Sequence, residues 1–138
     1  MAAKRGQQRH ILVINDTPAI LDLFRDVLAE KGYRVSTDTF TVAVETKLAE
    51  AKELKPDLIV LDYTVGGEGP GWQLLQLLKM DRATADLPVI VCTGAVRQVE
   101  ELQGHLKAMG VAVLLKPFDL DQIVAEVDRV WDRLGHDE

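Results

Sequence analysis

The sequence has only one cysteine, Cys92, so no disulfide can form within the chain, which is consistent with a reducing compartment. Long apolar runs are missing too. The longest, such as 58–61 and 111–115, fall far short of the ~20 residues that cross a bilayer. The first residues lack the apolar segment of a secretory signal. We therefore expect a cytoplasmic protein with no membrane partner.

The sequence has fewer basic than acidic residues, with 16 Lys and Arg and 22 Asp and Glu, which gives a net charge of −6. This balance disfavours contact with phosphate backbones, so nucleic acid is not expected as a direct partner. Apolar residues make up 47% of the 138 residues, which suits one domain with its own core. We place that domain at 11–134, between a flexible leader at 1–10, which includes His10, and a tail at 135–138.

Short β-branched runs alternate with longer segments in which apolar residues recur every three or four positions. Helix signals support the second kind: Thr17 and Pro18 start one helix, Gly32 ends it, and Asp119 with Gln122 forms a capping box. The predicted strands are 11–15, 34–38, 58–62, 88–93 and 111–115, and the predicted helices are about 18–31, 41–54, 71–80, 96–109 and 119–134. This alternation predicts an α/β fold, a five-stranded parallel sheet with five helices on both faces.

Polar residues stand directly after four of the apolar runs, and in such a sheet ligands bind beyond the carboxyl ends of the strands. Two carboxylates, a hydroxyl and an ammonium gathered at one edge form a set that can hold a divalent cation and a phosphoryl group. These residues are Asn15 and Asp16 after the first strand, Asp62 at the end of the third, Thr93 at the end of the fourth, and Lys116 with Pro117 after the fifth.

The segments ILVIND, DLIVLD, VIVCTGA and LLKPF, in this order and spacing, closely resemble the receiver domain of two-component response regulators over residues 11–134. The resemblance implies a flavodoxin-like doubly wound (βα)5 fold and a role in phosphorelay signalling. It implies that Asp62 accepts a phosphoryl group from a phosphohistidine on a sensor histidine kinase or histidine phosphotransfer protein. Such a protein assists its own phosphorylation and dephosphorylation and is otherwise not an enzyme.

The same resemblance assigns roles to the other strand-end residues. Asp16, Asp62 and the backbone carbonyl of Thr64 would hold Mg²⁺, a cation that prefers oxygen ligands. Thr93 would hydrogen-bond the phosphoryl oxygens, and Lys116 would pair with them. The bond between Lys116 and Pro117 would be a cis peptide that aims the ammonium.

Three features depart from the pattern of the family. Asn15 stands where an acid is usual, so we expect weaker Mg²⁺ binding, with the amide oxygen orienting a bound water. Val113 replaces the switch aromatic, so a signal must travel mainly through the loop after Thr93 and the fourth helix. The glycine-rich loop at 66–71 is interpreted as a tolerated surface insertion rather than a mobile lid.

The favoured hypothesis is a stand-alone receiver with no attached output domain. It would signal by protein contacts, as a monomer or weak homodimer. The resemblance implies that the contact face comprises the helix at 96–109, the strand at 111–115 and the helix at 119–134. The alternative is a degenerate receiver that binds partners without phosphorylation, which Asn15 and Val113 favour. An aspartate-nucleophile phosphohydrolase would need an acid where Pro18 stands, and a flavin-binding domain would leave Asp62, Thr93 and Lys116 unexplained.

Overall fold

The structure is a computed structural model, and it describes most of the chain. The described residues are 9–15, 17–39, 44–62, 70–93, 104, 106–108, 110–115 and 119–136. For Asp62 and Thr93 the description covers the main chain. Among the described helices, none combines the length and the apolar content needed to span a membrane.

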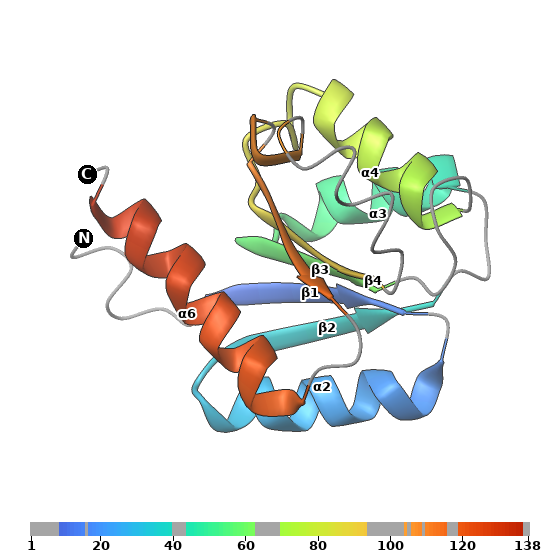
Figure 1. Cartoon of the computed structure of the whole chain (residues 1–138). Helices are drawn as coiled ribbons and strands as arrows, with labels where there is room; N and C mark the ends of the chain where they lie inside the picture. Colours follow the sequence, from blue (N-terminus) through green and yellow to red (C-terminus); the bar gives the residue numbers. More distant parts are fainter. Residues whose placement is uncertain are drawn as a thin grey trace.

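Five parallel strands form one sheet in the order β2-β1-β3-β4-β5 (Figure 1). The order places β3 at the centre, with β1 and β4 on its two sides, so the ends of these three strands are neighbours. β2 and β5 are the edge strands. The strands are β1 (His10–Ile14), β2 (Arg34–Asp38), β3 (Leu58–Asp62), β4 (Val89–Thr93) and β5 (Val111–Leu115).

Helices cover both faces of the sheet (Figure 1). Helices α2 (Pro18–Glu30) and α6 (Leu120–His136) lie on one face, and α3 (Val44–Leu54) and α4 (Pro70–Met80) lie on the other. This arrangement confirms the predicted doubly wound fold. Most of the predicted helix at 96–109 lies outside the described residues. The described part, residues 104 and 106–108, is helical.

The helix ends follow local sequence signals. In the predicted capping box, the Asp119 backbone N–H donates to Gln122 Oε1 at 2.8 Å, and the Gln122 N–H donates to Asp119 Oδ1 at 2.9 Å. Thr17 is the N-cap residue of α2 and Pro18 its first residue, but the Thr17 hydroxyl makes no capping hydrogen bond. Gly32 follows α2 with a φ of +95°, a conformation that glycine adopts without strain.

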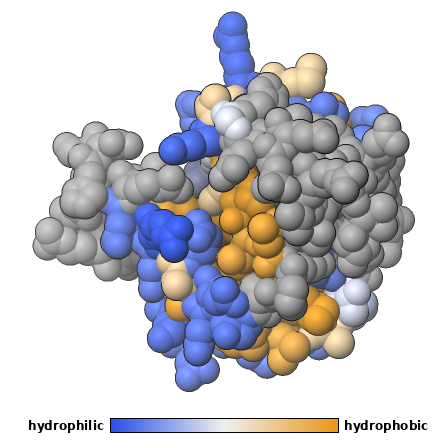
Figure 2. All heavy atoms as spheres, viewed as in Figure 1, coloured by the Kyte–Doolittle hydropathy of each residue, from blue (hydrophilic) through white to orange (hydrophobic). Residues whose placement is uncertain are grey.

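Two apolar clusters form the core, one on each face. Residues of β1 alternate between them: Ile11 and Val13 pack with α2 and α6, while Leu12 and Ile14 pack with α3 and α4. β5 is paired only with β4, and its last residue, Leu115, is 40% exposed. Figure 2 shows apolar side chains open to solvent over this strand.

One residue of the predicted leader belongs to the sheet. β1 begins at His10 rather than at Ile11, and the His10 side chain is buried. Its ring Nε2 lies 2.7 Å from Ser36 Oγ, and its backbone N–H donates to Asp57 Oδ2 at 2.8 Å. Ser36 and Asp57 come from distant parts of the chain and provide hydrogen-bond partners for the ring and the backbone N–H of His10. A hydrophobic pattern alone does not predict such partners.

Candidate functional site

The register of the central strands brings the predicted site residues to one edge of the sheet. Ile14 of β1 pairs with Leu61 of β3, so Asn15 and Asp62 follow as neighbours at the two strand ends. Asp62 in turn pairs with Cys92 of β4, which places Thr93 one residue beyond that pair. Three of the predicted residues therefore meet at the carboxyl edge, as the strand order requires.

The fourth strand extends this edge on its other side. Thr93 pairs with Leu115, the last residue of β5, and Lys116 is next in the sequence. Lys116, Pro117, Asp16 and Thr64 lie outside the described residues, so their predicted roles stay predictions. The cis peptide before Pro117 is among these.

Asn15 is the site residue whose side chain is described, and it is 3% exposed. Its backbone N–H donates to the Asp38 carbonyl at 3.0 Å, and its side-chain Oδ1 accepts the Thr17 N–H at 2.6 Å. This second bond is an Asx turn, in which a side-chain oxygen binds a backbone N–H two residues ahead. The amide oxygen thus has a structural partner, which leaves one lone pair for the bound water predicted above.

The described donors at this edge fit a hard cation. Asn15 presents an amide oxygen and Asp62 carries a carboxylate, and oxygen is the ligand that Mg²⁺ prefers. Histidine is absent from this edge among the described residues, since His10 lies at the opposite end of β1. Among those residues no group of three or more acidic, histidine or cysteine side chains forms a metal cluster, so a full ligand set needs the residues beyond them.

Sequence reasoning missed a buried ion pair beside this edge. Lys47 of α3 is nearly inaccessible, with a side chain 2% exposed, and its Nζ lies 2.5 Å from Asp38 Oδ1 at the end of β2. Two signals were available: Asp38 ends a strand as Asp62 does, and Lys47 stands four residues before the buried Ala51 on the same face of α3. A cavity of about 580 Å³ opens next to the pair and is lined by Thr37, Asp38, Glu50, Glu53 and Leu54.

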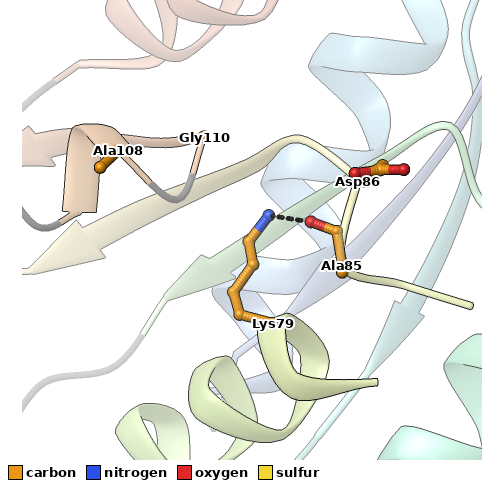
Figure 3. Close-up of a pocket in the computed structure, with 5 residues that line it drawn as sticks. All are labelled: Lys79, Ala85, Asp86, Ala108 and Gly110. Carbon is orange, nitrogen blue, oxygen red and sulfur yellow. Dashed lines mark hydrogen bonds between the residues drawn. The ribbon is translucent and has the colours of Figure 1, made fainter. Parts of the chain in front are cut away.

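A second cavity lies at the opposite, amino edge of the sheet. It has a volume of about 360 Å³ and is lined by Lys79, Ala85, Asp86, Ala108 and Gly110 (Figure 3). Lys79 Nζ donates to the carbonyls of Ala85 at 3.1 Å and Leu87 at 2.7 Å. Burial lowers the pKa of Lys79 from its usual value, with the nearby Asp86 carboxylate acting in the other direction. Its described lining residues include none of the predicted site residues.

Comparison with known proteins agrees with the geometry. A family model described as the response regulator receiver domain matches residues 11–128. The chain is 32% identical to the phosphate regulon transcriptional regulatory protein PhoB of Klebsiella pneumoniae, over 92% of this chain and 53% of that protein. It is 33% identical to the DNA-binding dual master transcriptional regulator RpaA of Synechocystis, over 93% of this chain and 54% of that protein. The chain thus spans about half the length of these relatives.

Solved structures share the fold. The chemotaxis response regulator CheY4 of Vibrio cholerae superposes with a TM-score of 0.72 at 23% identity, covering 90% of this chain and 99% of that one. A CheY-like receiver domain protein from Methanospirillum hungatei gives a TM-score of 0.75 at 21% identity, covering 96% of this chain and all of that one. The chain therefore belongs to the receiver domains of two-component response regulators.

Proposed function

We propose that Asp62 is the phosphoacceptor of this receiver. The supporting observation is that β1, β3 and β4 are adjacent and in a register that makes Asn15, Asp62 and Thr93 neighbours at one edge. Receiver domains are signalling modules that interact with histidine kinases or phosphotransfer proteins, and Mg²⁺ and phosphoaspartate are typical of them. The proposed donor is a phosphohistidine on such a partner, in the cytoplasm.

In the proposed reaction, a carboxylate oxygen of Asp62 forms a bond to phosphorus while the bond from phosphorus to the donor histidine nitrogen breaks. The leaving nitrogen keeps the electron pair of that bond. Asp16, Asp62 and the carbonyl of Thr64 would hold Mg²⁺, which supplies charge neutralisation for the incoming phosphoryl group. Thr93 would donate a hydrogen bond to a phosphoryl oxygen and Lys116 would pair with the added charge, so both favour the phosphorylated state.

The proposed output is a change in protein contacts rather than a reaction on a small molecule. Phosphorylation adds negative charge at the carboxyl edge, next to the loops that lead to the fourth helix and to α6. The edge strand β5 follows the fourth helix and precedes α6 in the sequence, and its exposed last residue, Leu115, suits a protein partner. The relatives named above are transcriptional regulators about twice as long, so their DNA binding is not carried over to these residues.

The proposal is tested by incubating the protein with Mg²⁺ and either acetyl phosphate or a phosphorylated histidine phosphotransfer protein. Intact mass should rise by one phosphate, and the Asp62→Ala variant should show no increase. The absence of labelling with both donors would overturn the proposal. It would favour the degenerate receiver, for which the Asn15 amide held in its turn and Val113 at the switch position are the supporting observations.

The pocket charge has its own test, because Asn15 removes one carboxylate from the proposed metal site. Asn15→Asp adds a negative charge next to Asp62, so Mg²⁺ should bind more tightly in a calorimetric titration. A carboxylate oxygen can still accept the Thr17 N–H, so the turn is preserved. Unchanged Mg²⁺ affinity in this variant would show that charge at position 15 does not control the site.

A further inference from the structure

The most unusual charged group among the described residues is Lys47. Its ammonium is buried on the inner face of α3, where Leu48 and Ala51 join the apolar cluster between α3, α4 and the sheet. Its ion-pair partners are Asp38 at 2.5 Å and Glu50 at 3.7 Å. Burying an ammonium is costly even when it is paired, and an apolar residue in its place is often as stable or more so. Stability alone therefore does not explain a lysine here.

Asp38 connects Lys47 to the candidate site through the main chain. Asp38 ends β2, whose only neighbour among the described strands is β1, so within the described part of the chain its last rung has strand support on one side alone. Its carboxylate accepts from Lys47 and also from the Thr39 N–H at 2.8 Å. Its carbonyl accepts the Asn15 N–H at 3.0 Å, and Asn15 is the residue that follows the last paired residue of β1, Ile14.

The chain of contacts continues into the turn that follows β1. Asn15, held by the Asp38 carbonyl, accepts the Thr17 N–H on its own side chain at 2.6 Å. Asp16, the proposed Mg²⁺ ligand, lies between Asn15 and Thr17 in the sequence. Both residues that flank this ligand are thus linked by hydrogen bonds to the pair formed by Lys47 and Asp38.

The Asp38 carboxylate and the Asn15 side chain lie on different faces of the sheet. Asp38 pairs with Ile14, whose side chain lies on the face covered by α3 and α4. Asn15 is the next residue of β1, and its side chain bonds instead to Thr17 at the start of α2. The two side chains therefore leave the sheet on opposite faces, and Asp38 reaches Asn15 through its carbonyl alone.

We propose that Lys47 is a positioning residue of the Mg²⁺ site, anchoring the end of β2 and, through Asp38, holding Asn15 and Thr17, the two residues that flank Asp16 in the sequence. The inference rests on the proposed function, since it assigns Lys47 a role toward the same metal site. Without the anchor the last rung of the edge strand opens more often. The ligands are then less often arranged for binding, which lowers the affinity for Mg²⁺.

The test compares Lys47→Met with Lys52→Met. Methionine keeps an unbranched side chain without the charge. Lys52 lies on the same helix and also pairs with an aspartate, Asp81, but at the other end of the sheet. Two quantities are measured: amide hydrogen exchange of Asn15 and Thr17 in the metal-free protein, and the Mg²⁺ dissociation constant by calorimetry.

In Lys47→Met both amides should exchange faster, and the dissociation constant should rise roughly tenfold, as for other residues that orient metal ligands. The thermal midpoint should fall only slightly, because the Asp38 carboxylate that loses its partner is 28% exposed and can be hydrated. Lys52→Met should leave exchange and affinity at their wild-type values. A role confined to stability would lower the midpoint and leave the Mg²⁺ dissociation constant unchanged.

Wild-type exchange and wild-type Mg²⁺ affinity in Lys47→Met would overturn the inference while leaving Asp62 labelling, and so the proposed function, intact. If the wild-type protein neither binds Mg²⁺ nor becomes labelled, the proposed function fails, and the role of Lys47 toward a metal fails with it. If Lys47→Met does not fold, the double variant Lys47→Met, Asp38→Asn replaces it, because this variant strands no charge. The same rise in the dissociation constant is expected from it.

Discussion

The two edges of the sheet use lysines of the same helix in different ways. At the carboxyl edge, Lys47 of α3 is 2% exposed and its partner Asp38 is 28% exposed. At the amino edge, Lys52 of α3 is 43% exposed and lies 3.0 Å from Asp81, just past the end of α4. The first pair continues by hydrogen bonds to Asn15 beside Asp62, whereas the second joins the ends of two helices.

This difference separates groups that support the fold from groups that support the site. The polar contacts described at the amino edge join neighbouring parts of the fold: Lys79 holds the segment before β4, and His10 holds Ser36 of the neighbouring strand. Changes there should alter stability and leave Mg²⁺ binding alone. Changes at the carboxyl edge should alter both, and the following experiments test that division.

The largest effect is expected from Asp38→Asn. The substitution keeps the shape of the side chain and an acceptor for the Thr39 N–H, but among the described residues it leaves the Lys47 ammonium with Glu50 at 3.7 Å as its one counter-charge. Removing one partner of a buried ion pair costs about 3–5 kcal/mol, and Glu50 should hold the loss near the lower end of that range. Urea unfolding with a constant m-value measures the loss.

Asp81→Asn is the matched control at the other edge. It removes the same charge from an exposed pair, where the lysine stays hydrated, so its effect on the free energy of unfolding should be much smaller. Equal losses in the two variants would mean that burial does not distinguish the two pairs, and the comparison between the edges would fail.

An intermediate effect is expected from Lys79→Met. The lysine donates to the Ala85 carbonyl, the bond drawn in Figure 3, and to the Leu87 carbonyl, and methionine leaves both acceptors to solvent. Because Lys79 is only half-buried, we expect a loss of about 1–2 kcal/mol in unfolding free energy. Mg²⁺ affinity and Asp62 labelling should match those of the wild-type protein and of the exposed control Lys107→Met. Weaker Mg²⁺ binding in Lys79→Met would break the proposed division between the edges.

Local and periodic signals predicted most of the fold. Each strand of the sheet lies within one residue of its predicted range, because apolar β-branched runs of this length suit strands buried on both faces. The capping box at Asp119 and Gln122 involves only neighbours in sequence, so it was readable directly. The doubly wound arrangement of the strands was implied by the resemblance to receiver domains, and the observed order brings Asn15, Asp62 and Thr93 to one edge.

The features that escaped prediction depend on contacts between distant residues. The spacing between Lys47 and Ala51 indicates the inner face of α3, but the sequence does not identify the partner of Lys47, because Asp38 lies on a different element. His10 looked like part of a leader for the same reason: its partners Ser36 and Asp57 become neighbours only when β1, β2 and β3 assemble. Pairing of polar groups is decided by tertiary packing, which a hydrophobic pattern does not encode.

The smallest effect is expected at His10, a titratable group at the amino edge whose protonation should change stability but not Mg²⁺ affinity. Burial lowers the pKa of His10 below its usual 6.5, and the nearby Arg34 charge lowers it further, whereas Asp57 and the Leu54 carbonyl act in the opposite direction. The unfolded chain therefore binds a proton near pH 6.5 that the folded protein resists. The stability that neutral His10 contributes is complete above pH 6.5 and is lost as pH falls from there through the folded pKa.

Replacing His10 by Gln keeps a polar group that can reach Ser36 and removes the titration, so the fall in unfolding free energy below pH 6.5 should become shallower. Urea unfolding at several pH values between 5 and 7.5 measures the difference between variant and wild type. Mg²⁺ affinity at neutral pH should be the same in both, because the ring lies at the amino edge. A parallel pH dependence in the two proteins would mean that another group titrates in this range, and a changed Mg²⁺ affinity would mean that the two edges are coupled through β1.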